Sequence, residues 1–407
     1  MKRIISILLP ICLLIFILGG CSADPIEKKY SFKKEKIDPG VIKGNTEFAF
    51  NLFRELNKED EYNNIFISPL SVSTVLTMTY QGAKNSTRDG MTEALNYQNM
   101  DIQQLNESYQ NLLRYLGQID KKVELNINNS IWVRQDKEIN QDFIEVNKDV
   151  FDAYVAELDF SKEDSASKIN QWIKDSTKGK IERMIDDQIS SNVIMYLINA
   201  IYFKGEWTEQ FKKQNTFEAK FQVEDGEVQD IMMMNKNGEI EYGEGDDFEV
   251  VRLAYGNGKT SMYMMLPKED VSINTFINNM DSDKWDEIRS SISKKKDVIL
   301  QIPRFKMEYG IKQLNDSLTN LGMGEAFTDS ADFSGIRDNL FISRVLHKAV
   351  IEVNEEGSEA AGVTVVEMKE SAAIEPITFI ADRPFTFIIA EDDTGTVLFM
   401  GKMYRGK

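Results

Sequence analysis

The segment from Val193 to Phe203 restricts the fold of this chain more than any other feature. It reads VIMYLINAIYF, an apolar run interrupted by one polar residue, Asn199. A run of this kind, with no alternation of polar and apolar residues, indicates a strand that is buried on both faces. We therefore expect a large sheet that is covered by other elements on either side.

The rest of the chain is rich in helical patterns in its first half and in strand patterns in its second half. We expect a helix capped by Asn45, a helix, turn and helix over 68–95, a strand over 123–133 and a helix from Asn140 onward. Further strands are expected over 218–266, with a hairpin at Asn257-Gly258, over 298–310 and over 377–404, with a helix between them that ends near Gly322. No linker-like stretch follows Ile42. The pattern predicts one large α+β domain over 42–407.

The N-terminus has the pattern of an export signal. Lys2 and Arg3 precede an apolar run from Ile4 to Leu18, which is short for a spanning helix. The run ends in Leu-Gly-Gly-Cys, which resembles the lipobox of bacterial lipoproteins. We expect residues 1–20 to be a signal peptide and 21–41 to be a flexible tether that is lipidated at Cys21. The alternatives are an ordinary secretory peptide or a signal anchor.

This interpretation places the protein outside the cytoplasm, anchored to the bacterial cell envelope through lipid alone. The formal net charge of −18 disfavours nucleic acid and anionic membrane surfaces as partners. The cysteines are Cys12, within the signal, and Cys21, so we expect no intramolecular disulfide in the mature chain.

Residues for catalysis or for metal binding are scarce. The chain has one histidine, His347, in the apolar context RVLHKAVIEV, where a structural role is more common than a catalytic one. A zinc site needs three or four nitrogen or sulfur ligands, more than the mature chain supplies. We therefore expect neither an enzyme nor a bound metal or cofactor.

Several stretches resemble the serpin family of protease inhibitors, and they follow one another in the order found in that family. They are NIFISPLS at 64–71, LINAIYFKGEW at 197–207, LHKAVIEVNEEGSEAAG at 346–362, ADRPFTFII at 381–389 and VLFMGK at 397–402. The resemblance implies a fold of three β-sheets and eight or nine helices with an exposed reactive loop. It also implies a metastable native state in which the loop, once cleaved, inserts into the main sheet.

The resemblance assigns roles to residues far apart in the sequence. Ser68, Ser71, Asn199 and His347 correspond to the shutter, where the central strands of the main sheet part. Trp207 corresponds to the breach, where insertion begins. The residues themselves suggest that Asn199 and His347, both polar in apolar surroundings, satisfy each other's hydrogen bonds.

The hinge of the reactive loop maps onto eight consecutive residues: Glu355, Glu356, Gly357, Ser358, Glu359, Ala360, Ala361 and Gly362. An inserted strand directs alternate residues to opposite faces of the sheet. If Ser358 faces inward, then Ala360, Gly362, Thr364 and Val366 do so too. The glutamates Glu359 and Glu367 then face outward, as insertion requires.

Family spacing from Glu355 places the reactive bond between Ser371 and Ala372. The segment that follows is about two residues longer than the common family pattern, so bonds after Met368, Lys369 or Glu370 remain alternatives. A bond after Ser371 would suit proteases with small primary pockets. A bond after Lys369 would suit trypsin-like proteases, and one after Glu370 a glutamate-specific protease.

These observations predict a monomeric suicide inhibitor of serine proteases, with cysteine proteases as a second class of target. The inhibitor would hold the protease as a covalent acyl complex while the cleaved loop inserts into the main sheet. The alternative is a non-inhibitory serpin that acts as a binding or chaperone-like protein.

Overall fold

The computed structural model describes residues 31–358 and 376–406. Its contacts divide the chain into Met1–Ser31 and Phe32–Lys407. All the helices and strands named below lie in the second unit.

Helices gather in the first half of the chain and strands in the second, as the sequence predicts. The helices are α1 (Pro39–Glu59), α2 (Pro69–Tyr80), α3 (Asn85–Ala94), α4 (Ile102–Leu116), α5 (Gln141–Phe151), α6 (Asp164–Ser176), α7 (Ile273–Asn278), α8 (Ser282–Ser291) and α9 (Asn315–Leu318). The strands are β1 (Ile65–Ile67), β2 (Val123–Arg134), β3 (Tyr154–Leu158), β4 (Met195–Glu206), β5 (Phe217–Gln222), β6 (Val228–Glu244), β7 (Phe248–Tyr255), β8 (Thr260–Pro267), β9 (Ser293–Glu308), β10 (Lys312–Gln313), β11 (Leu346–His347), β12 (Val350–Val353), β13 (Gly357–Ser358), β14 (Ile377–Ile380), β15 (Phe385–Glu391) and β16 (Val397–Met403).

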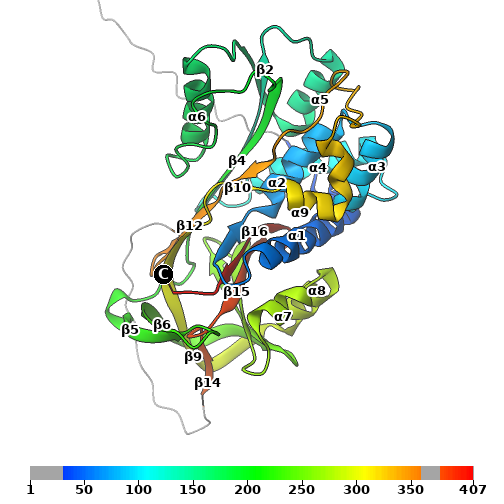
Figure 1. The fold of residues 1–407 in the computed structure, drawn as a ribbon. Helices are drawn as coiled ribbons and strands as arrows, with labels where there is room; N and C mark the ends of the chain where they lie inside the picture. Colours follow the sequence, from blue (N-terminus) through cyan, green and yellow to red (C-terminus); the bar gives the residue numbers. More distant parts are fainter. Residues whose placement is uncertain (1–30, 359–375, 407) are drawn as a thin grey trace, which may run out of the picture. The chain divides into compact units, whose positions relative to one another are not determined.

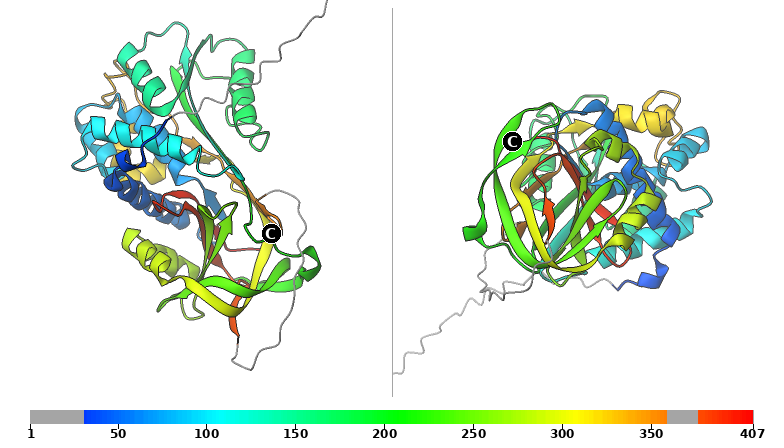
Figure 2. Two further views of the ribbon diagram at one scale, coloured as in Figure 1. Left: turned by 180° about the vertical axis from the view of Figure 1, so that it is seen from behind. Right: turned by 90° about the horizontal axis from the view of Figure 1, so that it is seen from below.

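The strands form three hydrogen-bonded sheets. The largest has the order β1-β16-β15-β8-β7-β6-β9-β12, with β5 beside β6 and β14 beside β9. The second has the order β13-β4-β2-β3, and the third joins β10 to β11. Figure 2 shows from below how the strands of the largest sheet curve around one another, with the blue helices to one side. Three sheets and nine α-helices within the described residues confirm the expected α+β fold.

Strand β4 contains most of the apolar run 193–203. It is buried on both faces over 198–202, as predicted, and half-buried over 195–197 and at Phe203. It pairs antiparallel with β2 from Val123↔Gly205 to Val133↔Met195. One face, which includes Leu197 and Ile201, belongs to the main core. The opposite face, which includes Ile198, belongs to a second apolar cluster with residues of α6. In Figure 1, β4 runs between α2 on one side and α6 on the other.

The first helix begins earlier than the predicted cap at Asn45, which lies buried inside α1. Asp38 is the N-cap, its Oδ1 accepts a hydrogen bond of 2.6 Å from the Gly40 N–H, and Pro39 is the first helical residue. A proline fits there because the first turn leaves its N–H groups without helical partners. Residues 32–41, which we assigned to the tether, therefore belong to the folded unit. Lys34, for example, forms an ion pair of 2.7 Å with Asp393.

Two predicted turns have the backbone geometry that their glycines suggest. Gly258 has a φ of +83° in the connection between β7 and β8, and Gly322 has a φ of +110° where the helical segment after α9 ends. Within residues 31–358 and 376–406, every helix is too short or too polar to cross a bilayer.

Candidate functional site

A cavity of about 540 Å³ lies between β4 and the chain segment 339–348. Residues of α2, including Ser71, Val75 and Thr79, also line it. The strand that follows this segment, β12, pairs with β9, and β11 pairs with β10. From Met195 to Ile201, the edge of β4 that does not pair with β2 pairs with no other described strand, and these residues line the cavity. We call this side the open edge of β4.

Three of the four predicted shutter residues lie together at the start of α2. The backbone N–H of Ser68 donates to His347 Nε2 at 3.0 Å. The Ser68 hydroxyl donates to the Leu398 carbonyl at 2.7 Å and accepts from the Ser71 N–H at 3.3 Å, which caps α2. These contacts tie the helix to both β11 and β16.

Asn199 does not bond to His347 in the described structure, so the predicted mutual hydrogen bond is wrong. Instead, Asn199 Nδ2 donates to Asn129 Oδ1 at 2.7 Å, across the paired strands β2 and β4. The sequence showed that Asn199 is polar and buried but not which neighbouring strand would meet it. Asn199 and His347 nevertheless line the same cavity.

The side-chain oxygen of Asn199 differs from that of Asn129, which accepts the hydrogen bond between the two amides. Asn199 is 8% exposed, and its Oδ1 has no hydrogen-bond partner among the described residues. A buried polar atom without a partner costs about 1–3 kcal/mol, so most proteins avoid one. The predicted shutter therefore contains an acceptor that has no donor among the residues that the structure describes.

Burial controls the charge of His347. The side chain is 4% exposed, and desolvation lowers its pKa to about 4. Because Nε2 accepts the Ser68 N–H, the neutral ring is the form that fits this site. This buried, hydrogen-bonded position is consistent with the structural role that the apolar sequence context of His347 predicts.

The predicted hinge contains a short strand, β13, that pairs with β4. Gly357 and Ser358 of β13 pair antiparallel with Glu206 and Gly205. A tight turn precedes them, in which Asn354 Oδ1 accepts from the N–H groups of Glu356 and Gly357. Gly357 has a φ of +140°, a conformation that side chains with a Cβ rarely adopt.

Trp207, the predicted breach residue, holds this turn against the end of β4. Its indole Nε1 donates to the Asn354 carbonyl at 2.9 Å, and its backbone N–H donates to the Glu356 carbonyl at 2.9 Å. Its ring stacks on Tyr255 with centroids 4.4 Å apart. Trp207 is thus a buried aromatic residue and a direct hinge contact at once.

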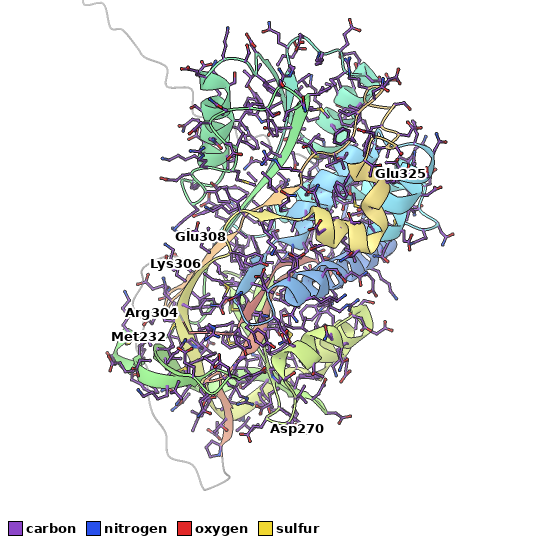
Figure 3. All side chains as sticks on the ribbon, in the orientation of Figure 1. Met232, Asp270, Arg304, Lys306, Glu308 and Glu325 are labelled. Atoms are coloured by element: carbon purple, nitrogen blue, oxygen red, sulfur yellow. The ribbon has the colours of Figure 1, made fainter. Side chains whose placement is uncertain are left out.

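Glu355 and Glu356, the two hinge glutamates within the described residues, have cationic partners for which the sequence carries no signal. Glu355 is 4% exposed, accepts from Thr216 Oγ1 at 2.7 Å and lies 3.6 Å from Arg304 Nη1. Glu356 forms an ion pair of 2.6 Å with Lys213. Figure 3 labels Arg304 on β9, followed along this strand by Lys306 and Glu308. No spacing rule links these distant residues, so the sequence carried no signal for them.

The remaining predicted site residues lie outside the described part of the chain. They are Glu359, Ala360, Ala361 and Gly362 of the hinge, Met368, Lys369, Glu370, Ser371 and Ala372 around the reactive bond, and Cys21. Among the residues whose positions are described, no group of three or more His, Cys, Asp or Glu side chains is placed to bind a metal ion.

The fold and the site define a protein with a four-stranded sheet in which the predicted hinge pairs with β4 at Gly205 and Glu206. The open edge of β4 continues from there toward Met195. A family model described as Serpin (serine protease inhibitor) matches residues 43–405, and the chain therefore belongs to the serpin family. It is 31% identical to an uncharacterized serpin-like protein of Methanosarcina acetivorans over 96% of each chain. It is 32% identical to the leukocyte elastase inhibitor of Bos taurus, over 88% of this chain and 97% of the relative.

Solved structures agree with this assignment. The native state of the thermophilic serpin tengpin matches with a TM-score of 0.82 and 32% sequence identity, over 92% of this chain and 96% of that one. The relatives thus include named protease inhibitors as well as serpins of unknown activity.

Proposed function

We propose that this protein is a suicide inhibitor of serine proteases that acts by inserting its cleaved loop at the open edge of β4. The observation that carries the proposal is the strand β13. Gly357 and Ser358 already form the first two pairs of an additional strand on β4, and the cavity continues along the same edge. After Glu359 the chain continues with the small residues Ala360, Ala361 and Gly362, which suit entry into a packed sheet.

The chemistry begins as ordinary proteolysis. The protease serine attacks the carbonyl carbon of the reactive bond, and the C–N bond breaks. The proton from the serine hydroxyl passes through the protease histidine to the departing amine, which becomes a new N-terminus. The ester that remains links the protease to the segment that follows Ser358.

Insertion then competes with hydrolysis of the ester. Each residue that enters beside β4 forms backbone hydrogen bonds and fills apolar cavity, so the free energy of the sheet falls as the strand grows. The protease moves with the ester and is trapped if insertion is faster than attack by water. The leukocyte elastase inhibitor among the relatives supports an inhibitory role, and the small residues near Ser371 favour an elastase-like or subtilisin-like target.

A protease panel tests this proposal. The mature protein is incubated with elastase-like, subtilisin-like, trypsin-like and glutamate-specific proteases, and the products are separated on denaturing gels. We expect a complex that survives denaturation and a released C-terminal peptide that begins between Lys369 and Ala373. Cleavage by every protease with no complex and no gain in thermal stability would overturn the proposal in favour of a non-inhibitory serpin.

We also propose that the protein is exported and held at the bacterial cell envelope by lipid on Cys21. The leader and the Leu-Gly-Gly-Cys ending support this. Metabolic labelling with a fatty acid should mark the wild-type chain and not Cys21→Ser. Equal labelling of both chains would overturn the lipid anchor.

A further inference from the structure

The cavity beside β4 is apolar over most of its wall. Its lining comes from α2, from the connection between α6 and β4, from β4 itself and from the segment 339–348, and it includes Val75, Leu76, Ile185, Leu197, Leu340 and Phe341. Phe341 is exposed, so the cavity reaches the surface at this residue. Water fills such a space poorly because each molecule needs two to four polar partners. An apolar guest would supply the packing contacts that the lining side chains lack.

Two polar side chains distinguish this cavity from a purely apolar void. Asn199 Oδ1 is a buried acceptor that has no donor among the described residues, and Asn199 lines the cavity. His347 lines it as well, and because its Nε2 accepts the Ser68 N–H, the neutral ring carries its proton on Nδ1. The wall therefore combines an acceptor with a donor. A hydroxyl group complements both, since it can donate one hydrogen bond and accept another.

The charged side chains of the wall disfavour an ionic ligand. They are Asp186, Arg344 and Lys348. Asp186 and Arg344 pair with each other, with 3.5 Å between Oδ2 and Nη1, and Lys348 Nζ lies 2.7 Å from a carboxylate oxygen of Glu308. An ion that entered the cavity would lose hydration without meeting an unpaired opposite charge among these described lining residues, which is unfavourable. The ligand that fits is neutral.

We propose that this cavity binds a neutral amphiphile, namely an apolar chain or ring that carries one hydroxyl group, and that the hydroxyl donates to Asn199 Oδ1. The volume of about 540 Å³ lies within the range of small-molecule sites. The apolar part of the ligand would lie against α2 and the segment 339–348, with its far end toward Phe341. Binding needs no protease. An occupant would also lie against the open edge of β4 and compete with any strand added there, a consequence that rests on the proposed function.

The test changes the ligand first, so that folding of a variant is not at issue. Three compounds with the same eight-carbon chain are titrated against the intact mature protein at about pH 7. They are 1-octanol, which has a hydroxyl donor, 1-methoxyoctane, whose ether oxygen accepts but cannot donate, and octanoate, which is charged. The dissociation constant is obtained from the saturable rise in the thermal midpoint.

We expect 1-octanol to bind with a saturable rise in the thermal midpoint. The affinity for 1-methoxyoctane should be about three- to tenfold weaker, because one hydrogen bond is lost. Octanoate should give no saturable rise.

Val75→Phe locates the site, because Val75 lines the cavity from α2 and a larger ring takes up part of the space. It should weaken 1-octanol binding by about tenfold or more. Val155→Phe is the matched control, since Val155 is also a half-buried valine but lies on β3, outside the cavity lining. Its affinity should equal that of the wild type. If Val75→Phe does not fold, Phe341→Ser at the exposed end of the cavity replaces it and should weaken binding by about twofold or more.

Each outcome decides one part of the proposal. No saturable binding of 1-octanol would overturn the site, and wild-type affinity in the cavity variant would overturn its location. Equal affinities for 1-octanol and 1-methoxyoctane would remove the hydrogen bond to Asn199, and tighter binding of octanoate would contradict a neutral ligand. None of these measurements involves a protease. Absence of binding therefore leaves the proposed inhibition standing, and absence of a protease complex leaves the binding site standing.

Discussion

His347 Nε2 accepts the backbone N–H of Ser68 at 3.0 Å, and this bond requires a neutral imidazole. The folded pKa of about 4 lies below the ordinary value of 6.5 because the ring is buried. Between these two values the unfolded chain takes up a proton that the folded protein does not. The free energy of unfolding should therefore decrease as the pH falls from 6.5, by up to roughly 3 kcal/mol at pH 4 from this group alone.

Other groups titrate in the same range, so the measurement needs a matched variant. His347→Gln keeps an acceptor for the Ser68 N–H but does not titrate. We expect the wild type to lose stability more steeply than His347→Gln in denaturant titrations at pH 7, 6, 5 and 4. Parallel pH curves for the two proteins would contradict the assigned pKa.

Gly357→Ala should weaken the hinge contact with β4. A Cβ at Gly357 would lie 2.3 Å from the Gly205 carbonyl oxygen and 2.7 Å from the Trp207 nitrogen, in addition to the strain of a positive φ. We expect a loss of about 1–3 kcal/mol in the free energy of unfolding. Denaturant unfolding would measure it.

Gly226→Ala is a control that separates the cost of backbone strain at a positive φ from the cost of a steric clash of the added Cβ. Gly226 also has a positive φ, of +90°, but a Cβ there meets nothing within 4 Å. Its substitution should cost only the backbone strain, about 1 kcal/mol. An equal loss in both variants would argue against a tight contact between β13 and β4.

Ala360→Arg should convert the protein from an inhibitor to a substrate. If insertion continues the register of β13, Ala360 would come opposite Phe203 on the core side of β4, where an arginine would bury an unpaired charge. We expect the yield of denaturant-resistant complex to fall about tenfold or more, while cleavage continues. Gel densitometry of complex against cleaved product would show this.

Ala361→Arg provides the matched control, since in the same inserted register a side chain one residue later would face away from the core. It should retain most of the complex. Inhibition that survives in both variants would contradict insertion along β4.

Lys402→Met should destabilise the fold at a site remote from the hinge. Lys402 is fully buried, and its Nζ donates to Asn57 Oδ1 at 2.6 Å and to the carbonyls of Asp60 and Glu61 at 2.9 and 2.8 Å. These two carbonyls follow the C-terminal end of α1, where a cation is favourable. Methionine keeps the length and leaves the acceptors without a donor, so we expect a loss of about 3 kcal/mol.

Lys306→Met is the control for this change, because Lys306 is exposed on β9. Its substitution should alter the unfolding free energy by less than about 0.5 kcal/mol. A similar loss in both variants would mean that the buried contacts of Lys402 contribute nothing measurable.

Local sequence patterns predicted those strands and turns that depend on a few consecutive residues. The apolar run at 193–203 gave β4, and the glycine at 258 gave the turn between β7 and β8. The apolar spacing begins at Phe48 and makes Asn45 the nearest capping residue, whereas α1 begins about one and a half to two turns earlier, with Asp38 as its cap and Pro39 as its first residue.

The residue types of the candidate site could be predicted from the sequence, but the hydrogen-bond and ion-pair partners of these residues could not. Asn199 was expected in the shutter, yet its bond to Asn129 depends on the register between β2 and β4, which the sequence does not contain. The same holds for Arg304 and Glu355, which are brought together by the packing of distant strands. The cavity beside β4 is a property of the assembled sheet and has no local signature.

The open edge of β4 has a consequence for how such a protein would serve a cell. Once the cleaved loop has paired with this edge, it would not leave the sheet again, because the cut peptide bond does not re-form. Each molecule would therefore act a single time, and protection would depend on the number of copies present. If the protease molecules outnumbered the inhibitor molecules, the excess protease would stay active until new inhibitor chains were synthesised.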